Sequence, residues 1–110
     1  MRDNTIARNY AETLLALAEH QQAIEAWGQL VDVTAAALSS PAIEAVMMTP
    51  RVPRDQKVVL VSQALEGAPR PFILFIAAGM RRGRIMLLGT MADEYHDLVD
   101  QKMNRVGAGI

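Results

Sequence analysis

The 110-residue chain has no cysteine, and aromatic residues make up only 5% of it. The lack of cysteine excludes a disulfide framework, a thiolate zinc site and a cysteine nucleophile. The formal net charge is −1, so no overall field favours nucleic acid or anionic lipid. The longest apolar run, Phe72 to Met80, has nine residues, whereas a membrane-spanning helix needs roughly 20. The N-terminus lacks the pattern of a signal peptide, so we expect the chain to stay where it is made.

Hydrophobic residues make up 51% of the chain, and most of them are aliphatic, which suits packed helices. The apolar spacing and the turn signals predict an all-α bundle of six helices joined by short loops. We expect Pro41 to begin the third helix and Gly83 to end the fifth. The expected helices run from a cap at Asp3 or Thr5 to about Glu19, from Gln22 to Leu38, from Pro41 over a short span, from Arg54 to Leu65, from Phe72 to Arg82, and from Arg84 to Arg105.

Few side chains suggest catalysis or metal binding. An acidic face with a histidine on the sixth predicted helix could hold a metal, but a solvated helix face is the stronger interpretation. Arg81 to Arg84 could hold a phosphate, but basic residues commonly close a helix. The chain has no Gly-rich phosphate loop and no nucleophile spaced with a base. We therefore expect no catalytic residue, no cofactor and no metal. The acidic face comprises Asp93, Glu94, His96, Asp97 and Asp100.

The first predicted helix carries more apolar surface than one core-facing stripe requires. Apolar residues cover about half of its cylinder at about 100° per residue, whereas a helix packing one face needs a stripe of roughly 100°. Either neighbouring helices cover both stripes, or the second stripe lines a groove for a partner helix. The core stripe is Ala7, Ala11, Leu14 (or Leu15) and Ala18, and the second stripe is Ile6, Tyr10, Thr13 and Leu17.

The fifth predicted helix is apolar all round, which predicts burial on every side. Its large residues Phe72, Phe75 and Ile76 share one face, which we assign to the core. The opposite side has smaller residues and ends in an arginine, as expected for a shallow groove floor with a charged rim. That side comprises Leu74, Ala77, Ala78 and Arg81.

Two short motifs resemble a known family. Ala7-Arg8-Asn9-Tyr10-Ala11 resembles the Ala-Arg-x-Tyr-Ala opening of the δ subunit of F-type ATP synthases. The mitochondrial equivalent of that subunit is the oligomycin-sensitivity-conferring protein. Met80 to Ile85 resembles the family's second signature, Ala-Glu-Asn-Gly-Arg-Leu, with arginines at the acidic and amide positions. The resemblance extends over essentially the whole chain.

The resemblance implies a non-catalytic stator subunit. Residues 1–105 correspond to the N-terminal helical domain, and residues 106–110 to the start of a linker. The linker would lead to a C-terminal domain, outside this chain, that grips the peripheral-stalk b subunits. The N-terminal domain would bind the N-terminal helix of an α subunit between its first and fifth helices. The complex would lie at the cytoplasmic face of a bacterial inner membrane, without direct membrane insertion, and the isolated domain would be a monomer. The implied contact residues are Ile6, Tyr10, Thr13, Leu17, Leu74, Ala78, Arg81 and Arg82.

Two other functions stay open on the sequence. A generic helical adaptor, such as a death-fold-like domain, would share the fold and have a different partner. An RNA-binding helical module would use Arg70, Arg81, Arg82 and Arg84. The near-neutral net charge argues against RNA, and a steep salt dependence of binding would argue for it.

Overall fold

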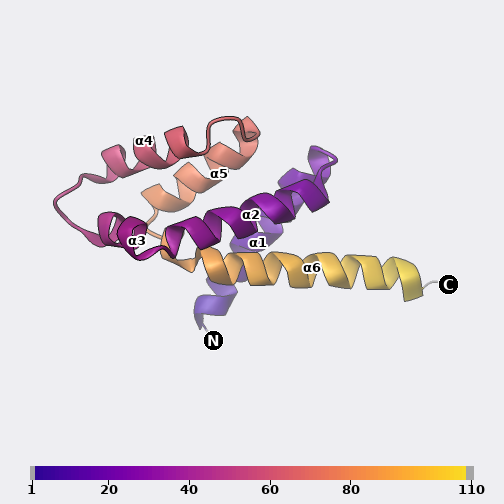
Figure 1. Ribbon diagram of the computed structural model, residues 1–110. Helices are drawn as coiled ribbons and strands as arrows, with labels where there is room; N and C mark the ends of the chain where they lie inside the picture. The colour runs from indigo at the N-terminus through magenta and orange to yellow at the C-terminus, as the bar shows by residue number, and fades with distance from the viewer. Residues whose placement is uncertain (1, 109–110) are drawn as a thin grey trace.

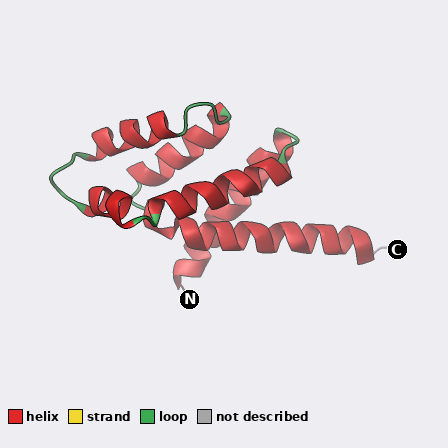
Figure 2. Cartoon of the chain, viewed as in Figure 1, coloured by secondary structure: helices red, strands yellow, loops and turns green. Residues whose placement is uncertain are grey.

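The computed structural model describes the backbone of residues 2–108 and the side chains of residues 5–103. All regular elements within this range are helical (Figure 2). The predicted all-α bundle of six helices is confirmed, with one additional 3₁₀ turn (Figure 1). The elements are α1 (Arg2–His20), α2 (Ile24–Leu38), α3 (Pro41–Met48), α4 (Arg54–Ala64), α5 (Arg70–Arg81), η1 (Ile85–Leu87) and α6 (Leu88–Ala108).

The predicted starts of α1 and α5 are wrong. α1 begins at Arg2, so Asp3 and Thr5 lie inside the helix and neither is its N-cap. An acidic residue is also favourable within the first turn, because it faces the positive end of the helix dipole. α5 begins at Arg70, ahead of the predicted Phe72, and Pro71 lies in its first turn. Proline is tolerated there because the first backbone N–H groups have no partner within the helix.

The sixth helix also differs from its prediction. The predicted start at Arg84 is wrong, because the 3₁₀ turn comes first and the Leu87 amide donates to the Arg84 carbonyl, 2.9 Å away. α6 then begins at Leu88 and continues past the predicted end at Arg105 to Ala108. Its second half projects beyond the other helices in Figure 1.

Helix α1 contacts α2, α5 and α6, and it packs most extensively against α6. Its predicted core stripe is confirmed, with Leu14 and not Leu15 as the third member, because all four residues are fully buried. Three of them are alanines, which let neighbouring helices approach closely. The core continues through Trp27, whose ring meets Phe72 edge-on with centroids 5.5 Å apart. The stripe comprises Ala7, Ala11, Leu14 and Ala18.

Helices α2 and α6 cross closely at a glycine. A Cβ on Gly28 would lie 3.3 Å from Cε2 of Tyr95 and 3.2 Å from Cε1 of His96. The buried Tyr95 hydroxyl donates to the Ile24 carbonyl of α2 over 2.6 Å. At the surface, Nε2 of His96 lies 2.8 Å from Oδ2 of Asp32. These contacts set the position of α6 against the bundle.

Within residues 2–108 no single helix is long and apolar enough to cross a membrane. Helices α2 and α3 taken together are long and apolar enough by length and composition alone, but the pair is bent by 78°.

Candidate partner-binding groove

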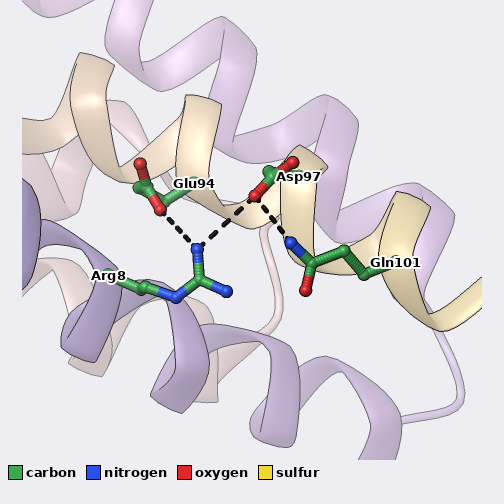
Figure 3. A network of polar contacts seen from close by, with 4 residues as sticks. All are labelled: Arg8, Glu94, Asp97 and Gln101. Carbon is green, nitrogen blue, oxygen red and sulfur yellow. Dashed lines mark hydrogen bonds and ion pairs between the residues drawn. The ribbon is translucent and has the colours of Figure 1, made fainter.

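Helix α1 has three distinct sides. The core stripe lies between two flanks, and one flank faces α6. There Nη1 of Arg8 donates to Oε1 of Glu94 over 2.9 Å and to Oδ2 of Asp97 over 3.4 Å (Figure 3). The Gln101 amide donates to the same Asp97 oxygen over 3.0 Å. The hydrogen bond that Arg8 donates to Glu94 raises the pKa of Arg8 above its ordinary value. The family-motif arginine therefore joins α1 to α6 and lies away from the predicted groove.

The opposite flank of α1 carries the second stripe. Ile6, Tyr10 and Leu17 are half-buried. Thr13 is exposed, and its hydroxyl donates to the Asn9 carbonyl over 3.2 Å. No helix within the described part of the chain buries this stripe completely, although α5 lies beside it.

Helix α5 contributes a buried and an exposed side. Phe72, Phe75 and Ile76 are buried as predicted. Leu74 is 53% exposed, so the prediction that α5 is buried on every side is wrong for this chain by itself. Ala78, Arg81 and Arg82 are also exposed.

The prediction that Ala77 lies on the exposed side of α5 is wrong. It is only 5% exposed, although the sequence analysis placed it on the open side with Leu74, Ala78 and Arg81. At about 100° per residue, Ala77 lies on the same side of the helix as the half-buried Ile73 and the buried Met80. Helix α4 packs against α5 and accounts for this second buried edge.

An aromatic pair joins the two flanks. The rings of Tyr10 and Phe75 meet edge-on, with centroids 6.1 Å apart and an angle of 77° between their planes. Phe75 is buried, as predicted, and its contact with Tyr10 also brings it to the half-buried flank of α1. The spacing could not reveal this double role, because Phe75 lies at the border between the buried and exposed sides of α5.

A hollow of about 380 Å³ opens at one end of this flank. It brings together three of the predicted contact residues, Ile6, Tyr10 and Arg82, and two that were not predicted, Asn9 and Arg84. The other five predicted residues do not line this hollow. Thr13, Leu17, Leu74, Ala78 and Arg81 lie further along the two helix flanks.

Helix α5 ends in a turn that requires a glycine. Gly83 has a φ of 73°, a left-handed conformation that L side chains rarely adopt. Its amide donates to the Met80 carbonyl over 3.0 Å, and the Arg84 amide donates to the Gly79 carbonyl over 2.9 Å. This pair of bonds is the Schellman arrangement. Arg54 of α4 adds a third contact, from Nη1 to the Arg81 carbonyl over 2.9 Å.

The acidic face of α6 is occupied by structural contacts. Glu94 and Asp97 pair with Arg8, and His96 pairs with Asp32. Among the described residues, no group of three His, Cys, Asp or Glu side chains is placed to hold a metal ion. His20 is exposed at the end of α1.

A second apolar hollow, of about 410 Å³, lies between α2, α3 and α4. Its walls include three large side chains that are at least two-fifths exposed, Val33, Ile43 and Leu60. This hollow is not among the features predicted from the sequence. The signal was present in the exposed apolar residues of α2 and α4, but their spacing alone is also that of a core stripe.

The fold defines the class: an all-helical domain in which the adjoining flanks of α1 and α5 leave apolar side chains partly exposed. Residues 6–110 match the family described as ATP synthase delta (OSCP) subunit, and the chain belongs to that family. The resemblance seen in the sequence is thereby confirmed. The delta subunit is a non-catalytic, structural subunit of the ATP synthase, which is a membrane-associated complex.

Three relatives, each named ATP synthase subunit delta, illustrate the similarity. The Gemmatimonas aurantiaca protein is 33% identical over 112 residues, covering 100% of this chain and 60% of the relative. The Acinetobacter baylyi protein is 30% identical over 103 residues, covering 93% and 58%. The protein of Anaeromyxobacter sp. strain K is 30% identical over 110 residues, covering 96% and 61%. The chain thus spans about three-fifths of the length of these relatives.

Proposed function

We propose that this chain is the head-binding domain of a stator delta subunit of an F-type ATP synthase. It receives the N-terminal helix of an α subunit between α1 and α5 and so links the catalytic head to the peripheral stalk. The stalk resists the torque of the rotating shaft. The b subunits of the stalk bind a C-terminal domain beyond this chain, and the complex lies at the cytoplasmic face of a bacterial inner membrane.

One observation carries the proposal: the aromatic contact between Tyr10 and Phe75 lies beside exposed apolar surface on both helices. Leu74 is 53% exposed, and Ile6, Tyr10 and Leu17 are only half-buried. Adjoining apolar flanks of two helices form the kind of groove in which an amphipathic helix lays its apolar face. Membership of the delta-subunit family supports the N-terminal helix of an α subunit as that helix. The proposed contact residues are Ile6, Tyr10, Thr13, Leu17, Leu74, Ala78, Arg81 and Arg82.

Calorimetric titration with a synthetic peptide tests the proposal. The peptide comprises roughly the first 20 residues of the cognate α subunit, which span about 30 Å as a helix. We expect saturable one-to-one binding with a negative heat-capacity change, the mark of apolar burial. Trp27 is fully buried against Phe72, so its fluorescence serves to check the fold of each variant.

A matched pair of variants locates the peptide. Leu74 on α5 and Leu60 on α4 are 53% and 49% exposed, so aspartate at either position should be tolerated similarly by the fold. Leu74→Asp should abolish binding, because it places a charge in the groove between α1 and α5. Leu60→Asp, in the hollow between α2, α3 and α4, should leave binding unchanged. The reverse result would move the α-subunit site to the second hollow.

Two outcomes would contradict the proposal, and each would favour a different function. A folded domain that fails to bind the peptide would favour a helical adaptor with another partner. Binding to RNA that weakens steeply with salt would favour the RNA-binding alternative.

A further inference from the structure

One end of the groove between α1 and α5 is cationic. Arg82 and Arg84 line the hollow of about 380 Å³ together with Ile6, Asn9 and Tyr10. Both arginines are exposed. The hollow thus joins two guanidinium groups to an apolar floor and to an amide side chain that can donate or accept a hydrogen bond.

The backbone fixes both arginines at this end. Arg82 follows the last residue of α5, and its amide donates to the Ala78 carbonyl over 3.2 Å. The left-handed turn at Gly83 then reverses the chain, and the Arg84 amide bonds back to Gly79. The two arginines are therefore held by main-chain geometry on either side of one residue, beside the first turns of α1.

The ion pairs among residues 5–103 involve Arg8, His96 and Lys102. None of them uses Arg82 or Arg84. Arg54 has a different role, because its guanidinium donates to the Arg81 carbonyl. Within the side chains that the structure describes, the positive charge at this end of the groove is thus not neutralised by a carboxylate.

We infer that Arg82 and Arg84 receive carboxylates carried in the first turn of the partner helix. The inference rests on the proposed function and specifies its chemistry. Guanidinium groups pair with carboxylates through charge-assisted hydrogen bonds. Acidic residues are most favourable in the first turn of a helix, next to the positive end of its dipole. The partner's N-terminus therefore lies at the cationic end, and the partner helix runs parallel to α1 with its apolar face on Tyr10.

Three versions of the α-subunit peptide test this chemistry. The first is the natural peptide, the second has glutamine in place of each acidic residue of its first two turns, and the third carries those acidic residues in its last turn. We expect the second and third to bind about three- to tenfold more weakly at about 50 mM salt, with a smaller difference at about 500 mM. Equal binding of all three would overturn the inference while leaving the proposed function standing. No binding of any version would instead reject the proposed function.

Variants of the domain provide the complementary test. The double variant Arg82→Gln/Arg84→Gln should lose the same three- to tenfold and become insensitive to the peptide's charge. A control double variant, Arg51→Gln/Arg70→Gln, removes the same net charge from exposed positions outside the hollow and should bind normally. Loss of binding in both would point to net charge alone and overturn the inference. A third variant is Asp3→Asn. If binding depends on the charge of the peptide only in this variant, the two arginines pair with α1 of this chain and not with the partner, and the inference is overturned.

Discussion

Tyr10 of α1 presents its ring edge-on to Phe75 of α5, with the ring centroids 6.1 Å apart. Tyr10 is half-buried, whereas Phe75 is only 9% exposed. The pair therefore connects the proposed groove to the core. A substitution of Tyr10 should therefore affect partner binding more strongly than the packing of α1 against α5.

Replacing Tyr10 by alanine should weaken binding of the α-subunit peptide by about 1–3 kcal/mol, as loss of an aromatic interface residue does. Tyr10→Phe should bind much more tightly than Tyr10→Ala, because it retains the ring contact with Phe75. Calorimetric titration of the three proteins checks the order. Val33→Ala is the control, since Val33 is 68% exposed and lies on α2.

Thermal unfolding of Tyr10→Ala tests whether Tyr10 belongs to the groove or to the core. Tyr10→Ala should remain folded, because the ring is only half-buried. If this variant is unfolded at room temperature, Tyr10 belongs to the core and its assignment to the groove is wrong.

An indole at position 78 should fill the groove. Ala78 is exposed on α5, so Ala78→Trp should fold normally and raise the Kd of the peptide about a hundredfold or more, which is about 2.7 kcal/mol. Ala42→Trp, at an exposed position on α3, is the matched control. Normal peptide binding by Ala78→Trp would show that the partner does not lie over this part of α5.

The sequence predicted the helices and the core of α1 well, because both follow from local periodicity. The four buried residues from Ala7 to Ala18 repeat at helical spacing, and only one arrangement buries them together. The sides of α5 were harder to assign. Ala77 and Ala78 have the same side chain, and only the position of α4 decides that the first is buried and the second exposed.

The ends of the groove depended on geometry that the spacing does not encode. Arg84 follows Gly83 in the sequence and was counted among the residues closing a helix. The left-handed turn at Gly83 brings it back beside Tyr10. Likewise Arg8 belongs to the same motif as Tyr10, but about 200° of helical rotation separates them, and Arg8 pairs with Glu94 of α6.

Gly83 should be the least replaceable glycine at the groove. Gly83→Ala should lower the free energy of unfolding by about 1 kcal/mol, because a Cβ is unfavourable at a φ of 73°. Gly89 lies in α6, and a Cβ there would meet nothing within 4 Å. Gly89→Ala should therefore raise stability by about 0.5 kcal/mol. Urea unfolding of the two variants measures both changes, and equal effects would show that the turn at Gly83 carries no strain.

The buried hydroxyl of Tyr95 should make stability depend on pH above 10. Burial, with a smaller contribution from the charge of Glu19, raises the pKa of Tyr95 to about 12 from its ordinary value of 10.0. Below pH 10 both states keep the phenolic proton, and the stabilisation is fully present. Between pH 10 and about 12 the unfolded chain has lost that proton while the folded chain retains it. The free energy of unfolding then falls by at most about 1.4 kcal/mol per pH unit.

Comparison with Tyr95→Phe isolates this contribution from other groups that titrate at high pH. At neutral pH the variant should be less stable by about 1 kcal/mol, because it loses the 2.6 Å hydrogen bond to the Ile24 carbonyl. Urea unfolding of both proteins from pH 9 to pH 12 should show the wild type losing its advantage as the pH rises, since only its folded state holds a phenolic proton. A stability difference that stays constant over this range would mean that the Tyr95 hydroxyl titrates alike in both states. In that case its burial between α2 and α6 would not raise its pKa.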